Sequence, residues 1–240
     1  MEKDMDQTKL NRKIELVFGL LLLLSAGLLG VEGAKAVSAQ NGYRIQSKTV
    51  VIDVGHGGID SGKVSEDGIL EKDVNLVIAK KLAQLLEQED IEVTLTREDD
   101  RGLYRDSDQN KKTTDLRNRC KMIEDINPIC TVSIHQNSYP SPEVRGAQVF
   151  YYRHSTQAQK LAQLIQESIR ERVDPDNTRQ EKPNDSYYML KRSTSPTVIV
   201  ECGFLSCPKE AQLLTEEDYQ NKLAWAIHMA VLNYVNQTES

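Results

Sequence analysis

Short apolar runs and longer amphipathic segments follow one another along the chain, which predicts strands and helices in turn. We predict buried strands where β-branched runs end in glycine or polar residues, at 48–55, 91–97, 130–135, 146–152 and 197–203. We predict helices where apolar residues recur at helical spacing, at 72–89, 114–127, 155–172 and 216–237. Polar, turn-rich segments at 98–112 and 174–185 are predicted loops. This alternation predicts an α/β fold, a three-layer sandwich whose central twisted sheet is mixed, mostly parallel, and covered by helices on both faces.

The N-terminal segment differs from the rest of the chain. Basic residues precede an uncharged run from Leu16 to Val31, and small residues follow at 34–39. This order is typical of an export signal. The uncharged run would span about 24 Å as a helix, slightly less than the ~30 Å of a hydrocarbon core. We therefore expect residues 1–39 to be either a cleaved signal peptide or a membrane anchor through residues 14–31, and residues 40–240 to form one folded domain outside the cytoplasm.

The overall charge and the cysteines restrict the classes of partner and of site. A net charge of −6 gives no basic surface for nucleic acid or for an anionic membrane. Partners must therefore be recognised by a specific site. The four cysteines could form two disulfides in an exported protein, but their spacing contains no CxxC pair, which argues against a structural zinc knuckle. We expect mostly unpaired, partly buried thiols.

Four residues with metal-binding or acid–base chemistry lie at predicted element ends. His56 follows the first strand between glycines, His135 and Glu201 end two later strands, and Glu71 precedes the first helix. The carboxyl ends of strands are where α/β sheets build their sites. Two histidines and one carboxylate form the usual ligand set of a catalytic zinc, and a second glutamate is then free to act as a general base.

Each of these residues also has a structural explanation. Glu71 could stabilise a helix N-terminus, His56 could occupy a loop, and His135 could be a core residue. Glu201 is harder to explain in this way, because a carboxylate after Thr-Val-Ile-Val is costly to bury without a partner or a cation. The structural explanations together require four coincidences. Asp53 and Asn137 are adjacent candidates for orienting the histidines.

Motifs of other enzyme classes are absent from the sequence. No HExxH helix, phosphate-binding GxxxxGK[ST] loop or GxSxG nucleophile elbow occurs. Instead, several segments resemble, in order and approximate spacing, the catalytic domain of zinc N-acetylmuramoyl-L-alanine amidases, the amidase type 3 family. They are IDVGHGGIDSG, LEKDVNL, VTLTRE, SIHQN, RGAQVFYY and PTVIVECGFLS.

The resemblance implies one zinc ion per catalytic domain, with His56, Glu71 and His135 as ligands and Glu201 as the catalytic glutamate. It implies a peptidoglycan substrate, cleaved at the amide between N-acetylmuramic acid and L-alanine of the stem peptide. Val54, Gln136 and Cys207 depart from the common family pattern, but none removes a ligand. The segment after His135 is short and the sequence shows no wall-binding repeats. In both respects the chain most resembles the sporulation and germination amidases of endospore formers. That similarity implies action in the cell wall or spore cortex, and in the cortex the removal of peptides precedes muramic-lactam formation.

Two alternatives stay open. Another zinc peptidoglycan hydrolase, such as a deacetylase or carboxypeptidase, would use a similar ion. A non-catalytic wall-binding relative would keep the fold without turnover. The sequence also leaves open whether a partner protein activates the enzyme by stabilising its zinc.

Overall fold

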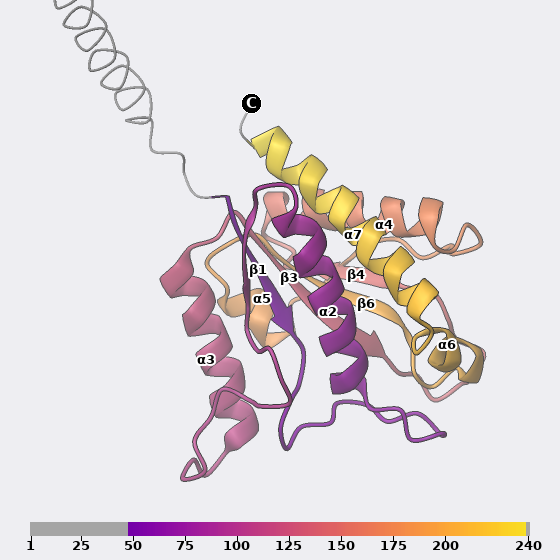
Figure 1. Cartoon of the computed structure of the whole chain (residues 1–240), viewed down its shortest axis with the longest axis horizontal. Coiled ribbons are helices and arrows are strands. Elements are labelled where there is room, and N and C mark those ends of the chain that lie inside the picture. Colours follow the sequence, from indigo (N-terminus) through magenta and orange to yellow (C-terminus); the bar gives the residue numbers. More distant parts are fainter. Residues whose placement is uncertain (1–47, 239–240) are drawn as a thin grey trace, which may run out of the picture. The chain divides into compact units, whose positions relative to one another are not determined.

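A six-stranded sheet lies at the centre of the computed structural model, which describes residues 48–238 (Figure 1). The strands are β1 (Thr49–Val54), β2 (Glu92–Leu95), β3 (Cys130–Asn137), β4 (Gln148–Tyr151), β5 (Lys182–Pro183) and β6 (Thr197–Phe204). Their order across the sheet is β2-β1-β3-β6-β4-β5. All neighbouring strands are parallel except β4 and β6, which are antiparallel. The predicted mixed and mostly parallel sheet is confirmed.

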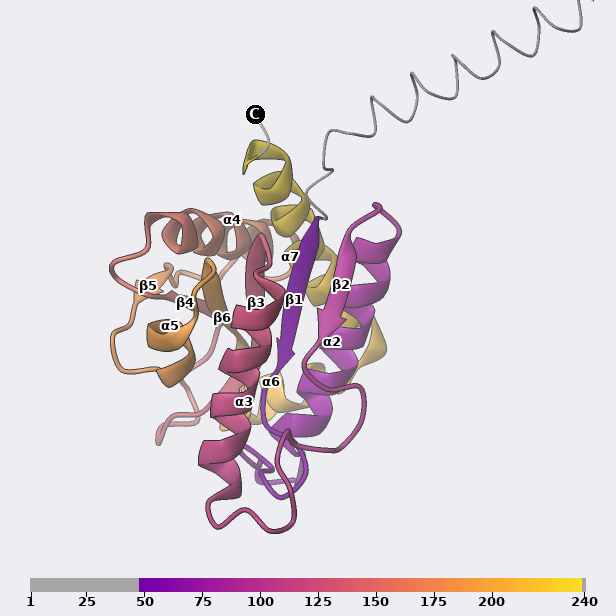
Figure 2. The ribbon, with the colours of Figure 1, turned by 90° about the vertical axis from the view of Figure 1, so that its left-hand side faces the viewer.

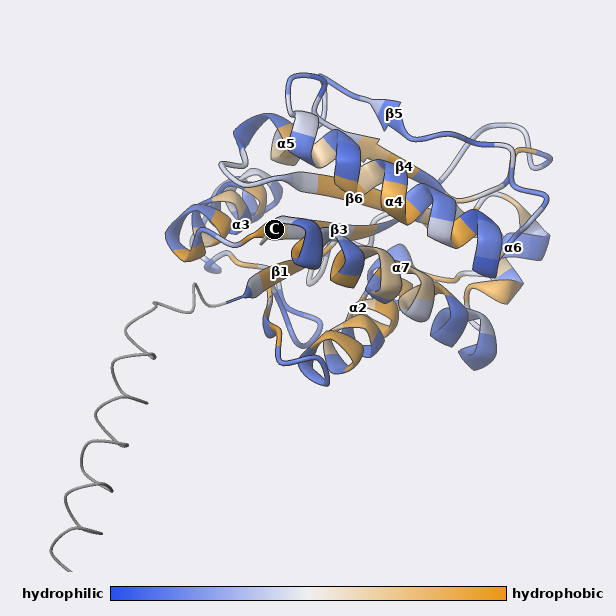
Figure 3. Ribbon diagram, turned by 90° about the horizontal axis from the view of Figure 1, so that it is seen from above, coloured by the Kyte–Doolittle hydropathy of each residue, from blue (hydrophilic) through white to orange (hydrophobic). Residues whose placement is uncertain are grey.

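Helices cover both faces of this sheet. One face packs against α2 (Glu71–Glu87), α4 (Thr156–Arg172) and α7 (Glu217–Thr238), and the other against α3 (Lys111–Ile126) and α5 (Tyr188–Arg192) (Figures 1 and 2). The short helix α6 (Pro208–Leu213) follows β6. Apolar residues line the strands and the inner sides of the helices, while the outer sides are polar (Figure 3). The three-layer arrangement is therefore confirmed.

The alternation of side chains along the strands separates the core from the polar residues. On β3, Val132 and Ile134 join the large apolar cluster beneath α2, α4 and α7. Ser133 and His135 point to the opposite face, since successive strand residues alternate. The carboxyl ends of β1, β3 and β6 meet at one edge of the sheet because these strands are parallel. Polar side chains from three strands are thereby brought together.

Several local features differ from the predicted elements. Strand β5 lies inside the predicted loop 174–185, and the short helices α5 and α6 were not predicted. These elements are too short to show a hydrophobic period. Helix α3 begins at Lys111 rather than 114, because the side chain of Asn110 caps it by accepting a hydrogen bond of 3.1 Å from the Thr113 amide.

The cysteines agree with the expectation of unpaired thiols. All four are free and buried, which is more complete burial than we expected. Burial raises the pKa of the Cys120 thiol to about 11 and that of Cys130 to about 12. These groups therefore stay protonated and unreactive at neutral pH.

No helix within residues 48–238 combines the length and apolar character needed to cross a bilayer. The predicted signal or anchor in residues 1–39 lies outside the described part of the chain, so it stays a prediction.

Candidate metal centre

His56 leaves the end of β1 in a sharp turn. Its backbone has φ of +62°, a left-handed conformation that residues other than glycine rarely adopt. Gly57 and Gly58 continue the turn with positive φ. Backbone hydrogen bonds of 2.9 and 3.1 Å between Gly57 and Asp60 close it. The turn directs the imidazole away from the strand and over the edge of the sheet.

Two buried arginines donate hydrogen bonds to the backbone carbonyls of this turn. Arg97 donates to the carbonyls of Val54, Gly55 and His56 over 2.8–3.1 Å. Arg119, 1% exposed, donates to the His56 carbonyl over 2.6 Å and also binds the carbonyl of Val54. Buried carbonyls at a strand end would otherwise lack donors, so the arginines offset a desolvation cost and fix the strained backbone.

The imidazole of His56 is oriented by a carboxylate that the sequence reasoning missed. Its Nδ1 lies 2.9 Å from Oδ2 of Asp60, and its Nε2 lies 3.1 Å from Oε1 of Glu71. Oδ1 of Asp60 accepts a hydrogen bond of 2.7 Å from Lys112. A carboxylate on the far nitrogen fixes the tautomer and ring orientation of a metal-binding histidine. The i,i+4 spacing after a glycine turn was the available signal.

Glu71 opens α2 and is almost fully buried, with 2% exposure. Its Oε1 lies 3.0 Å from Nδ1 of His135 and accepts a 3.0 Å hydrogen bond from the Gln136 amide, while its Oε2 accepts one of 2.7 Å from the Lys63 amide. Burial alone would raise the pKa of Glu71, but the hydrogen bonds from the two imidazoles outweigh it and hold the pKa well below the usual range. The carboxylate is thus ionised.

His135 stands on β3, next to the histidine from β1. The ring centroids lie 4.9 Å apart with the planes at 79°. Burial favours the neutral ring, but the hydrogen bond to Glu71 outweighs this and raises the pKa of His135 to about 9. A Cβ atom at Gly55 would lie 2.5 Å from the His135 ring, so only glycine lets β1 pass this close.

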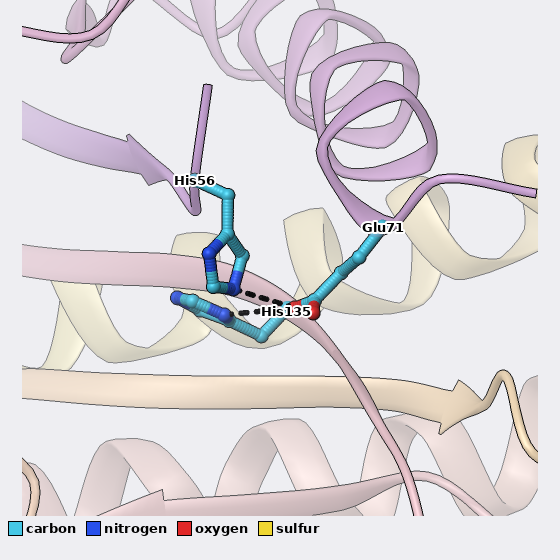
Figure 4. Close-up of side chains that lie close together, drawn as sticks. All are labelled: His56, Glu71 and His135. Carbon is cyan, nitrogen blue, oxygen red and sulfur yellow. Dashed lines mark hydrogen bonds and ion pairs between the residues drawn. The ribbon is translucent and has the colours of Figure 1, made fainter. Parts of the chain in front are cut away.

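Three candidate ligand atoms converge, one from each of His56, Glu71 and His135 (Figure 4). They all lie within 4.8 Å of one another, and they come from the end of β1, the start of α2 and the end of β3. An ionised carboxylate and two imidazoles at this separation suit a divalent metal ion.

Glu201 lies beside this cluster on β6, where it is the register partner of His135. It is 7% exposed, and its Oε2 has no hydrogen-bond partner among the described residues. Burial raises the pKa of Glu201 to about 7 despite the opposing effect of His135. His135 and Glu201 line a cavity of about 180 Å³ whose walls include Tyr187, Met189 and Ile199. A buried carboxylate that lines a cavity and has one oxygen without a hydrogen-bond partner fits a group that exchanges protons with a bound molecule.

The two residues expected to orient the histidines make other contacts. Asp53 accepts hydrogen bonds from Ser133 (2.5 Å), Thr96 and Arg119 (both 2.9 Å). Burial would raise its pKa, but the Arg119 guanidinium holds the pKa below its usual value. The side chain of Asn137 accepts from the Ser138 amide. No described hydrogen bond joins either residue to His56 or His135, so their orienting role stays a prediction, while Asp60 makes the contact.

Comparison with known proteins accounts for this arrangement. A family model described as N-acetylmuramoyl-L-alanine amidase matches residues 50–233. The chain belongs to this amidase family. The match spans every element from β1 to most of α7, including all four candidate site residues.

Individual amidases of the family are also similar to this chain. The germination-specific N-acetylmuramoyl-L-alanine amidase of Bacillus subtilis is 36% identical over 196 residues, which cover 80% of this chain and 82% of the relative. The solved structure of the CwlD amidase from Clostridioides difficile, in complex with the GerS lipoprotein, is 42% identical with a TM-score of 0.77, over 79% of this chain and 99% of that one. The solved N-acetylmuramoyl-L-alanine amidase from Clostridium difficile 630 is 36% identical with a TM-score of 0.71, over 79% and 97%.

Proposed function

We propose that this chain hydrolyses the amide between N-acetylmuramic acid and L-alanine of the peptidoglycan stem peptide, using one zinc ion held by His56, Glu71 and His135. The observation that carries the proposal is the convergence of the three ligand atoms within 4.8 Å, next to a buried glutamate with a bare oxygen. Membership of the amidase family supports the choice of bond. Two histidines and a carboxylate leave a fourth zinc position open, as in catalytic rather than structural sites.

The residues divide the chemistry between them. A bound zinc ion supplies Lewis acidity, which lowers the pKa of water toward 7 and polarises a carbonyl. Glu201 accepts a proton from the attacking water as the new C–O bond forms. It then delivers that proton to the L-alanine nitrogen as the C–N bond breaks. A pKa of about 7 suits both transfers at neutral pH. Asp60 fixes the ring of His56, which would be one of the three residues that hold the ion.

The cellular setting follows from the same reasoning. We propose that residues 1–39 direct export and that residues 40–240 form the zinc amidase domain, which acts in the cell wall or spore cortex. The germination-specific relative supports a role in cortex maturation, in which peptide removal precedes muramic-lactam formation. The solved complex of CwlD with a lipoprotein supports an activating partner for this chain as well. No described feature favours binding of nucleic acid.

The test is mass spectrometry of muropeptides after incubation with the purified full-length protein. We expect free stem peptides with an N-terminal L-alanine, loss of these products with a chelator, and recovery when zinc is added back. Release of acetate or of terminal D-alanine instead would assign the protein to the deacetylases or carboxypeptidases. Unchanged muropeptides with zinc bound would indicate a wall-binding relative, unless addition of a partner protein restored cleavage.

A further inference from the structure

A second cavity, lined mostly by polar residues, includes a residue of β4, the strand that pairs with β6 and Glu201. It has a volume of about 480 Å³ and is lined by Arg145, Gly146, Gln148, Asp174, Asn177 and Arg179, among others. Gln148 on β4 is the antiparallel register partner of Glu201 on β6. Directly opposed residues have side chains on the same face with Cα atoms about 5 Å apart, so the cavity begins next to the glutamate.

Arg179 is fixed in this cavity by neutral groups only. Its Nε donates to the Arg145 carbonyl over 2.7 Å and its Nη1 donates to Oε1 of Gln148 over 3.2 Å. The guanidinium carbon lies 4.7 Å from the centre of the Phe204 ring. These three contacts hold the guanidinium in one position before any ligand binds.

The backbone around Arg179 is also fixed. The Arg179 amide donates to Oδ1 of the buried Asn177 over 3.0 Å, and Asn177 in turn donates to the Ala147 carbonyl over 2.9 Å. Glu210 joins the two walls, accepting from the amides of Gly146 (2.9 Å) and Phe204 (2.8 Å). Buried hydrogen bonds of this kind make the cavity a formed site.

No carboxylate within residues 48–238 lies within 4.0 Å of the Arg179 guanidinium, and its Nη2 has no hydrogen bond there. Arg145 is different, because its Nη1 lies 3.9 Å from Asp174. Asp174 and Asp176 line the cavity too, so its net charge is small, but the charge of Arg179 is not paired. A half-buried, preorganised guanidinium without a counter-ion is a carboxylate-binding group.

We propose that Arg179 binds a free carboxylate of the stem peptide, so that the enzyme prefers peptides in which this carboxylate is not amidated. This inference rests on the proposed function, since it names a substrate feature recognised beside the same centre. The glycan consists of neutral N-acetylated sugars, and the muramic carboxyl is consumed in the scissile amide. The carboxylate must therefore come from the peptide. The first such group along the stem peptide is the α-carboxylate of the second residue, because the carboxyl group of L-alanine is used in the peptide bond.

The test uses two soluble substrates that differ only in one group. N-acetylmuramoyl-L-alanyl-D-glutamate carries an α-carboxylate on the second residue, and N-acetylmuramoyl-L-alanyl-D-isoglutamine carries an amide there. With the zinc-loaded full-length protein we expect kcat/KM to be roughly tenfold higher for the glutamate form, the effect of one charge-assisted hydrogen bond. Arg179→Gln should lower kcat/KM for that form by about the same factor through KM, and leave the isoglutamine form unchanged.

Two further variants separate recognition from structural damage. Arg179→Lys keeps the charge without the planar fork and should retain part of the preference. Arg153→Gln removes another arginine, exposed and paired with Asp185 after the far end of β4, and should leave both substrates unchanged. Equal cleavage of the two substrates by the unaltered protein, or an equal loss of both in Arg179→Gln, would overturn the inference.

A measurement of peptide binding tests the inference independently of whether the protein cleaves any substrate. The product peptides L-alanyl-D-glutamate and L-alanyl-D-isoglutamine can be titrated by calorimetry. Selective binding of the glutamate peptide, lost in Arg179→Gln, supports the inference even if no substrate is cleaved, whereas that lack of cleavage counts against the proposed function. Equal binding of the two peptides overturns the inference even if both substrates are cleaved.

Discussion

The contact between Asp60 and His56 leads to a prediction about zinc affinity. In Asp60→Ala, the imidazole loses the 2.9 Å contact at Nδ1 that fixes its tautomer and directs Nε2 toward Glu71. Loss of such a carboxylate lowers metal affinity by about 10- to 100-fold, which corresponds to about 1.4–2.7 kcal/mol. The effect should fall on binding rather than on folding, because the turn itself is closed by backbone hydrogen bonds.

The matched control is Lys112→Ala, which removes the other side chain that contacts Asp60. Lys112 is 62% exposed, and exposed ion pairs contribute about 0–1 kcal/mol, so zinc affinity should change by less than roughly fivefold. The assay is competition for zinc with a chromophoric chelator, with circular dichroism to confirm the fold. An Asp60→Ala protein that is folded and binds zinc as tightly as the unaltered protein would refute the orienting role.

Three further predictions concern the other groups of the fold. Glu201→Gln should keep zinc, measured by elemental analysis, and lower kcat by about 10²- to 10⁴-fold, since it removes the general base; near-normal turnover would exclude that role. Arg119→Met should lower the free energy of unfolding by about 3–5 kcal/mol in urea titrations, because Asp53 would stay buried without its cation; a loss below 1 kcal/mol would contradict this. Burial lowers the pKa of His228 below 6.5, so near that pH the unfolded chain binds more protons than the folded one. The free energy of unfolding should therefore fall as the pH decreases from 6.5 toward the pKa of the folded state. His228→Leu should flatten this dependence of the free energy of unfolding on pH, and an unchanged dependence would show that other groups cause it.

The sequence predicted the layers of the fold well because its central strands β1, β3 and β6 are almost entirely buried. Runs such as Thr-Val-Ile-Val before Glu201 can only be accommodated between two layers of helices, and the edge of a parallel sheet then gathers the strand ends. The proximity of His56, Glu71 and His135 followed from that edge, and the structure brings these residues together.

What could not be predicted depends on side-chain direction and on short irregular segments. Adjacency in sequence suggested Asp53 as a partner of the histidines, but it did not indicate the hydrogen bonds that Asp53 makes with Ser133 and the buried Arg119. Asp60 reaches His56 only because of positive φ angles at His56 and the glycines after it. Arg179 lies in a segment without periodicity, and its position depends on Gln148 and Phe204, which are distant in sequence.

The position of β6 in the sheet has a consequence for the timing of activity during synthesis. Among the described strands, β6 is made last, yet it lies between β3 and β4, which do not pair with each other. A chain made only as far as Pro196 has two separate sheet fragments with exposed edges, which cannot form the native core. Glu201 arrives in the strand that joins them. Closure of the sheet and acquisition of the proposed general base are therefore one event, and an unfinished chain is unable to act on the wall of the cell that makes it.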